Sequence, residues 1–419
     1  MNQLARKLLH PSRAFKYALI GTLGLQAATA AGIIISDQLR KRRVPGGIKG
    51  FPHLPPQETQ LAGNQVAIYT DGQALYRDML KAIRNAQKTI FFESFIWKGD
   101  EVGKEFKTAL IEAAKRGVDV YCIYDAFANL VVSPKFQIFP QIPNLHVLRF
   151  PIFRLDMLIF RQRPYGRDHR KILVVDGQVG WVGGYNIGKL YATSWRDTQV
   201  RIEGHAVWEL ENTFVEFWNQ FRRRHHPKLP DRGARSWDSR IQAVANTPSA
   251  LLYPIRGTYL DAIKRANERI WITQAYFIPD REFIHALGLA VKRGVDVKVM
   301  IPERSNHVLA DWVSAATFSE LLENGVEIWL YQHAMVHAKT ATIDGRWCTI
   351  GTANVDRLSM QGNFEVNVTF HGDHTAEVME RVFENDMTTA RRLDPVEWAQ
   401  RPVWHRVIEH IIGPTWFWL

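Results

Sequence analysis

The sequence predicts an α/β protein built from two related domains, and three observations support this prediction. The 419 residues are 46% apolar and 23% charged, enough for two domain-sized hydrophobic cores. Long stretches of the first half return in the second half. Within each half, short apolar runs typical of strands alternate with segments typical of helices, which is the pattern of an α/β sandwich.

The repetition is clearest around two histidines. "HRKILVVDGQVGWVGGYN" from His169 returns as "HAKTATIDGRWCTIGTAN" from His337, at an offset of 168 residues without a gap. Earlier in each half, "KRGVDVYCIYD" returns as "KRGVDVKVMIP" and "AIRNAQKTIFFESFIW" as "AIKRANERIWITQAYFIP". We therefore expect two diverged copies of one domain, related by a pseudo-twofold axis.

The expected elements follow the same order in each copy. A helix ending near "AQK" or "ANE" leads to an apolar strand, then a second helix and a glycine-containing turn. The strand "VDVYCIYD" or "VDVKVMI" comes next, and then the histidine strand. That strand ends in an Asp-Gly turn before another apolar strand, and Asp-Gly in such a place predicts a hairpin.

Composition suggests the domain boundaries. We predict a first domain over residues 60–225, a second over 251–395, and a polar linker broken by proline and glycine over 226–250. Residues 1–50 form a hydrophobic segment with basic flanks, and 396–419 form an aromatic tail. Both cysteines fall in apolar strands, so we expect core thiols and no disulfide.

The N-terminal segment predicts a membrane anchor. Residues 18–35 carry no charge, and nine Lys/Arg against one acid lie within residues 1–49, which leaves only +3 of the net +11 for the rest of the chain. About 20 apolar residues cross a bilayer. A cleaved signal peptide and a surface helix are the alternatives, but basic residues 40–43 would oppose export after cleavage.

The histidine strands predict a site for an anion. Residues two apart on a strand share a face, so His169 lies beside Lys171 and His337 beside Lys339. An imidazole beside a fixed cation suits phosphate, whereas the lysine would repel a divalent ion, so we expect no metal and no cofactor. A lone strand histidine is usually structural, but a core has no reason to repeat one polar group, so the repetition indicates function.

Further polar residues repeat after each histidine. Asn186 and Asn354 follow glycines and small residues, and their amides can donate to a phosphate oxygen. The same offset pairs Asp197 with Glu365. A carboxylate kept at equivalent places beside each histidine can accept its other ring N–H and fix its orientation.

Two further acids are candidates of a different kind. Asp176 and Asp344 each lie seven residues after their histidine, on the opposite strand parity, at the first position of a turn. We include them among the candidate catalytic residues, with a turn and packing role as the alternative.

Displacement at a phosphodiester gives the duplication a reason. Attack and departure occur on opposite sides of phosphorus, so one group must act as nucleophile and another as acid for the leaving oxygen. One histidine strand supplies one of these, and two strands meeting across the pseudo-twofold axis supply both. The lysines and asparagines would stabilise the charge on the phosphoryl oxygens.

H-x-K-x4-D followed by G-G/T-x-N, twice in one chain, resembles the phospholipase D superfamily. "RDHRKILVVDGQVGWVGGYNIGKLY", "WRDTQVRIEG" and "VHAKTATIDG" resemble its bacterial cardiolipin synthase branch, and the resemblance covers residues 65–390. The resemblance implies two phospholipase D-like α/β sandwich domains behind the anchor. It also implies a two-step, metal-independent transfer through a phosphohistidine, with His169 as nucleophile and His337 as acid and then base, or the reverse.

For a cardiolipin synthase, the resemblance implies transfer of a phosphatidyl group from a donor phospholipid to phosphatidylglycerol at the bacterial inner membrane. A phospholipase D hydrolase releasing phosphatidic acid and a nuclease are the rival functions, and a non-catalytic scaffold is a third. We expect phospholipid and membrane as partners and no nucleic acid, because the positive charge lies beside the apolar N-terminal segment.

Overall fold

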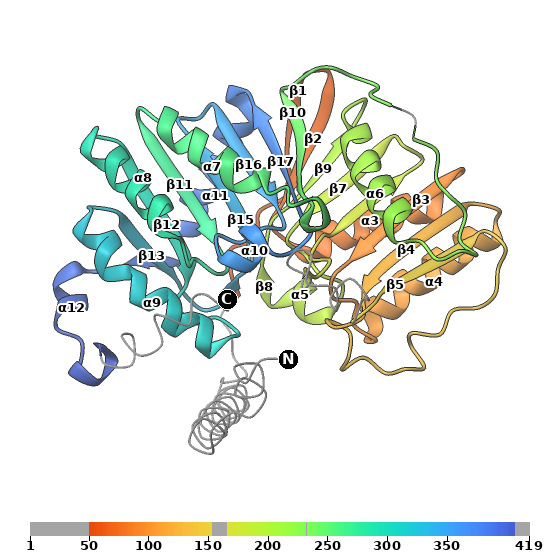
Figure 1. The fold of residues 1–419 in the computed structure, drawn as a ribbon, viewed down its shortest axis with the longest axis horizontal. Coiled ribbons are helices and arrows are strands. Elements are labelled where there is room, and N and C mark those ends of the chain that lie inside the picture. The colour runs from red at the N-terminus through yellow and green to blue at the C-terminus, as the bar shows by residue number, and fades with distance from the viewer. Residues whose placement is uncertain (1–49, 153–165, 232, 407–419) are drawn as a thin grey trace, which may run out of the picture.

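The computed structural model describes residues 50–152, 166–231 and 233–406, and these form two α/β halves side by side (Figure 1). The first half comprises β1 (Gln57–Leu61), β2 (Asn64–Tyr69), α3 (Gly72–Asn85), β3 (Thr89–Ser94), α4 (Glu101–Lys115), β4 (Asp119–Asp125), β5 (Leu145–Phe150), β6 (Ile172–Val175), β7 (Val179–Gly183), α5 (Lys189–Thr193), β8 (Trp195–Arg196), β9 (Gln199–Glu203) and α6 (Val207–Phe221).

The second half follows a similar order, with one more helix between its second and third parallel strands. It comprises β10 (Ile241–Asn246), the short 3₁₀ helix η2 (Pro248–Ala250), α7 (Pro254–Arg265), β11 (Arg269–Gln274), α8 (Arg281–Lys292), β12 (Asp296–Pro302), α9 (Val308–Glu323), β13 (Glu327–Tyr331), β14 (Met335–Val336), β15 (Lys339–Ile343), β16 (Trp347–Gly351), α10 (Arg357–Gln361), β17 (Glu365–His371), α11 (Asp373–Met387), β18 (Ala390–Arg392) and α12 (Pro395–Ala399).

Each half has one eight-stranded mixed sheet. The orders are β1-β2-β9-β7-β6-β3-β4-β5 and β10-β17-β16-β15-β11-β12-β13-β18. In each sheet three strands run parallel to one another (β3, β4, β5; β11, β12, β13). The hairpin that follows each histidine pairs antiparallel with the first of these strands, through β6 in the first sheet and β15 in the second. The α/β fold class is thus confirmed, and seven of the eight strands take corresponding places in the two sheets.

Equivalent residues start equivalent helices. Asp100 caps α4 by accepting the N–H of Gly103 at 3.0 Å, and Asp280 caps α8 by accepting the N–H of Phe283 at 2.9 Å. An aspartate at this position satisfies one of the orphan N–H groups of a helix start. The predicted helices therefore begin where their capping residues lie.

Hydrophobic clusters fill each half and join the two halves. One lies between the first sheet and helices α3 and α4, and another between the second sheet and helices α7 and α8. A further cluster contains α6, α11 and the facing sides of both sheets, with Phe91, Phe214, Ile350 and Met379 all buried. Because both copies contribute to this cluster, they pack as one body along their shared face (Figure 1).

The predicted Asp-Gly hairpins are confirmed. Asp176 and Gly177 have φ angles of 55° and 64°, and Asp344 and Gly345 have 55° and 65°. Positive φ at both central residues is the signature of a tight type I′ turn between antiparallel strands. The two cysteines are free and buried, as predicted.

Other predicted segments need comment. Residues 226–250, expected as a linker, include β10, which pairs antiparallel with β17 at the edge of the second sheet. The anchor at residues 18–35 and the tail from residue 407 lie outside the described residues. Within the described ranges, no helix has both the length and the apolar character needed to cross a membrane.

Candidate active site

The two histidines lie where the copies meet. His169 and His337 precede the strands β6 and β15 rather than lying inside them, which corrects the predicted strand starts. The segments before them pair with the other copy: Val336 pairs in parallel with Arg196, and Asp168 with Phe364.

Backbone hydrogen bonds hold the segment before each histidine against the other copy. The N–H of His337 donates to the carbonyl of Arg196 at 2.7 Å, and the N–H of His169 donates to that of Phe364 at 3.0 Å. The residue after each of these carbonyls is the predicted acid. Each of these pairings therefore brings an acid of one copy to the histidine of the other.

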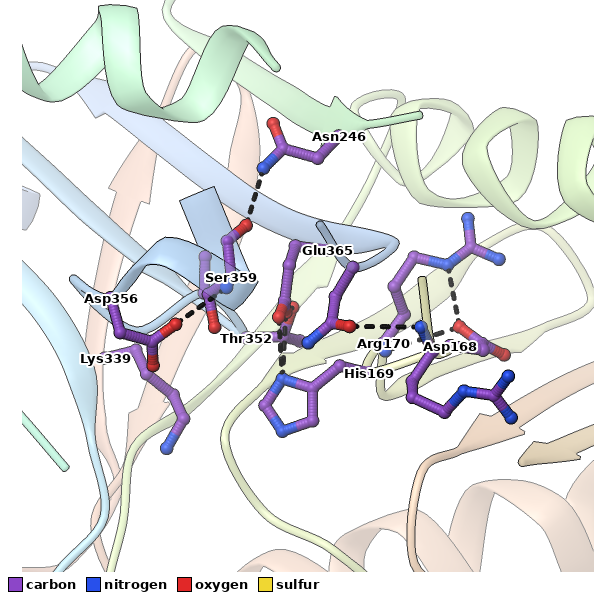
Figure 2. A network of polar contacts seen from close by, with 12 residues as sticks. Asp168, His169, Arg170, Asn246, Lys339, Thr352, Asp356, Ser359 and Glu365 are labelled. Atoms are coloured by element: carbon purple, nitrogen blue, oxygen red, sulfur yellow. Dashed lines mark hydrogen bonds and ion pairs between the residues drawn. The ribbon is translucent and has the colours of Figure 1, made fainter. Parts of the chain in front are cut away.

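The side chains of the histidines and acids contact each other in the same way, between the copies. Nδ1 of His169 lies 2.9 and 3.0 Å from the two carboxylate oxygens of Glu365, as Figure 2 shows, and Nδ1 of His337 lies 2.6 Å from Oδ2 of Asp197. The sequence placed one acid beside each histidine at equivalent positions, and the structure shows that the acids are exchanged between the copies. With Nδ1 at the carboxylate, Nε2 is the ring nitrogen that the acid does not contact.

Both acids are buried and supported. Glu365 is fully buried and accepts the hydroxyl of Thr352 at 2.5 Å (Figure 2). Asp197 is 2% exposed and accepts the N–H of Thr198 at 2.7 Å. Burial raises the pKa of Glu365 to about 7, although Lys171 opposes the rise.

The two lysines are buried cations held against the histidine backbones. Lys171 donates to the carbonyl of His169 at 2.6 Å, and Lys339 donates to the carbonyl of His337 while its Nζ lies 3.0 Å from Nδ1 of that ring. Burial lowers the pKa of Lys171 to about 7 and that of Lys339 to about 8.

The histidines respond to lysines of both copies. Burial, and then Lys171 and Lys339, lower the pKa of His169 well below its usual range. Burial and the same two lysines lower the pKa of His337 to about 3. Because the lysine of each copy lowers the pKa of the histidine of the other copy, the four residues form one electrostatic unit.

The predicted asparagines are buried beside the loops that follow β3 and β11. Asn186 is 2% exposed, and its Oδ1 accepts the N–H of Ile96 at 3.1 Å, which leaves the amide nitrogen as a donor. Asn354 is 4% exposed, and within the described chain its Oδ1 has no hydrogen-bond partner. A phosphate-binding role for both amides remains a prediction.

Asp176 and Asp344 lie at the opposite ends of β6 and β15 from the histidines. Each carboxylate accepts three successive backbone N–H groups at the start of a neighbouring strand, at 2.8–3.0 Å, and the donors are Gln87, Lys88 and Thr89 for Asp176 and Asn267, Glu268 and Arg269 for Asp344. Their inclusion among the catalytic residues is therefore corrected in favour of the turn role.

Sequence reasoning missed a buried ionic network behind His169. Arg170 donates through Nε to Asp168 at 3.2 Å and through Nη2 to Glu93 at 2.5 Å, and all three side chains are buried (Figure 2 shows Arg170 and Asp168). Asp168 and Arg170 flank the histidine on the opposite strand parity in "RDHR". The signal available in the sequence was this pair of charged residues, at positions that alternate with those of His169 and Lys171.

A second missed residue is Asp356, which caps α10 by accepting the N–H of Ser359 at 2.7 Å (Figure 2). Burial raises the pKa of Asp356 to about 7.

In the described part of the chain, no group of three or more His, Cys, Asp or Glu side chains is arranged to hold a metal ion.

The fold and this paired site define a phospholipase D-like protein, in which two copies of one domain contribute to one centre. The family model described as "Cardiolipin synthase, PLD-like domain" matches residues 79–218 and 259–387. The chain therefore belongs to the cardiolipin synthase family of phospholipase D-like proteins.

Curated relatives agree with this assignment. The chain is 33% identical over 361 residues to the major cardiolipin synthase of Bacillus subtilis (strain 168), covering 83% of this chain and 74% of the relative. It is 35% identical over 353 residues to cardiolipin synthase 1 of Staphylococcus aureus (strain COL), covering 81% and 71%.

A solved structure supports the fold alone. The phosphatidylserine synthase of Haemophilus influenzae Rd KW20 aligns over 86% of this chain and 94% of its own, with a TM-score of 0.64 and 14% identity. At that identity the likeness concerns the fold and not the activity.

Proposed function

We propose that this protein is a phosphatidyltransferase that makes cardiolipin and glycerol from two phosphatidylglycerol molecules. The observation that carries the proposal is the exchange of acids between the copies, which holds two imidazoles at one centre through their Nδ1 atoms. Two oriented imidazoles supply a nucleophile on one side of phosphorus and an acid on the other. Membership of the cardiolipin synthase family supports phosphatidylglycerol as the substrate.

In the first step, Nε2 of His169 attacks the phosphorus of the donor lipid. A P–N bond forms, the bond from phosphorus to the glycerol oxygen breaks, and His337 gives its proton to the departing glycerol. The phosphodiester charge, bound between Lys171 and Lys339, offsets the cations that lower the pKa of His337, so the ring takes up its proton as substrate binds.

In the second step, the primary hydroxyl of another phosphatidylglycerol attacks the phosphohistidine. Neutral His337 accepts the hydroxyl proton, the P–N bond breaks, and cardiolipin leaves with His169 restored. Glu365 and Asp197 stabilise whichever imidazole carries positive charge, and they hold both rings in place throughout.

The reaction also requires a lipid surface. We propose that residues 18–35 anchor the protein in the bacterial cell membrane, on the strength of their apolar length and basic flanks. The anchor would keep the site within reach of two membrane lipids in succession, which a transfer between lipids needs.

Incubation of the purified protein with phosphatidylglycerol labelled in its phosphate tests the reaction. The expected products are labelled cardiolipin and unlabelled glycerol in equal amounts. Phosphatidic acid as the main product would identify a hydrolase with water as acceptor, and cleavage of added DNA without any lipid product would identify a nuclease. Either result would replace the transferase proposal.

A further inference from the structure

The second half contains a large apolar cavity that the reaction above leaves unused. Its volume is about 510 Å³, within the range of about 300–1,000 Å³ that is typical of small-molecule sites. It lies between α9, the ends of β12 and β13, and the segment that carries α12. Figure 1 shows α9 and α12 close together on this side of the second half. Apolar side chains that include Phe277, Ile301, Phe318, Leu330 and Trp398 line it.

The cavity begins beside the catalytic centre. Its wall includes Ala275, whose N–H donates at 3.0 Å to the carbonyl of Ala338, the residue between His337 and Lys339. The next wall residue is Tyr276, whose ring centroid lies 6.4 Å from that of His337. A lipid phosphate at His337 would therefore have this apolar space within reach of its acyl chains.

The corresponding region of the first half is built differently. Trp97 stands where the second half has Phe277, and its ring contacts Phe136 and Phe139 with centroids 5.8 Å apart in each case. The void lined by Trp97, Phe136 and Phe139 has a volume of only about 10 Å³. The neighbouring pocket of the first half has a volume of about 420 Å³, and polar or charged residues contribute to its lining, namely Gln137, Arg149 and Arg223. The space is therefore partly polar in the first half and mainly apolar in the second.

Charged side chains on the lining compensate one another. Arg391 contacts Glu303 at 2.9 Å and Glu397 at 3.5 Å. The guanidinium of Arg401 lies 4.2 Å from the ring centroid of Trp398, and it donates to Ser319 at 3.1 Å. With these charges paired or stacked, the lining offers a ligand mainly hydrocarbon contact.

Aromatic rings flank the cavity on the α12 side. Trp404 is 55% exposed and lies 6.0 Å from the ring of Trp312, which lines the cavity, and Val403 beside it is 71% exposed. Tryptophan favours the boundary between lipid headgroups and acyl chains. The surroundings therefore match a lipid rather than a water-soluble ligand.

We infer that this cavity binds one acyl chain of a phosphatidylglycerol whose phosphate lies at His337. The inference rests on the proposed function, because it places the same lipid at the same site. It assigns the two copies different duties: both supply catalytic groups, and only the second holds a chain. The enzyme would then distinguish long-chain from short-chain lipids through the second half.

A pair of adjacent substitutions on α9 tests the inference. Ala315 lines the cavity, whereas Ala316 does not. A315F should raise KM for dioleoyl phosphatidylglycerol about tenfold or more, because its ring occupies the chain site, and should leave KM for the dihexanoyl lipid unchanged. The control A316F should leave both values within twofold. Equal behaviour of A315F and A316F toward both lipids would overturn the inference.

Photolabelling of the unaltered protein separates this inference from the proposed reaction. Phosphatidylglycerol with a diazirine at the end of one acyl chain should label peptides within residues 310–318, and unlabelled dioleoyl lipid should compete. This outcome does not depend on turnover, so it would support the chain site even if no cardiolipin formed. Label confined to other parts of the chain would overturn the inference while leaving the transferase activity to its own test.

Discussion

The half-site of His169 and the half-site of His337 contain the same functional groups, but different neighbours hold their acids. Glu365 is positioned by the hydroxyl of Thr352 at 2.5 Å. At the equivalent position the first copy has Gly184, where a Cβ would lie 2.0 Å from Oδ1 of Asp197. Asp197, the shorter acid, thus requires a glycine at this position. Glu365, the longer acid, is held by a hydroxyl from the same position. Threonine in place of the second glycine of the motif therefore goes together with glutamate in place of aspartate as the acid.

The residues that precede the two acids differ more strongly in their chemistry. Phe364, which precedes Glu365, packs its ring 5.0 Å from that of Phe217. Arg196, which precedes Asp197, forms a buried ion pair with Asp386 at 3.0 and 2.5 Å. One acid is therefore delivered by aromatic packing and the other by a salt bridge between the copies.

The difference shows which parts of a duplicated site are free to diverge. The histidines and lysines, which we propose contact the substrate, are the same in both copies. Groups that only position them can change from ionic to apolar when the replacement fills the same space. The unequal supports also give the two imidazoles unequal surroundings, which a nucleophile and an acid require.

Removal of either imidazole should have the largest effect. We expect H169A and H337A each to lower lipid transfer at least about 10⁴-fold, because each removes a group that acts in both steps. A donor with a p-nitrophenol leaving group needs no acid for departure, so H337A should still release one equivalent of nitrophenol in a burst and H169A should release none. H374A, on an exposed helix position, is the control. A burst from H169A alone would reverse the assigned roles.

The buried ion pair should dominate stability. D386N leaves the guanidinium of Arg196 buried without its countercharge, so we expect a loss of about 3–5 kcal/mol in the free energy of unfolding, measured by urea denaturation. The double variant R196M/D386L replaces the pair with apolar groups and should recover most of this loss. A change below 1 kcal/mol in D386N would show that water reaches the pair.

Much of this site could be predicted from the sequence, and the remainder depends on distant packing. The twin histidines, lysines and acids were identifiable because a polar pattern repeated at one offset, and the Asp-Gly turns because their chemistry is local. The exchange of Asp197 and Glu365 was not predictable, since spacing shows equivalence within a copy and not contact between copies. β10 was hidden in a polar segment, because its strand identity comes from pairing with β17.

The acids should have a smaller effect that separates the half-sites by pH. We expect E365Q and D197N each to lower transfer about 10²-fold, since each loosens one imidazole. Below pH 7, Glu365 gains a proton and no longer balances a charged His169, so activity of the unaltered enzyme should fall as pH decreases through about 7. D197N should keep this acid limb, and E365Q should lose it. An unchanged limb in E365Q would assign it to another group, such as Asp356.

The smallest effect concerns the cost of keeping two lysines buried. The pKa of Lys171 in the folded protein is about 7, against 10.5 when unfolded, so the unfolded chain binds more protons between these values and the stability of the empty enzyme rises with pH across this window. Below pH 7 both states are charged, and the full cost of burying the cation is present.

K171M removes that cation while keeping a side chain of similar length. We expect it to raise the free energy of unfolding by about 1–2 kcal/mol at pH 7, with the gain shrinking as pH increases toward 10, and to abolish most lipid transfer. K339M should gain less, because the pKa of Lys339 is lowered only to about 8. Urea denaturation from pH 7 to 9.5 measures both variants. If K171M were instead less stable than the unaltered enzyme, attraction to Glu365 would outweigh the cost of burial, and the first half-site would be preassembled by charge pairing.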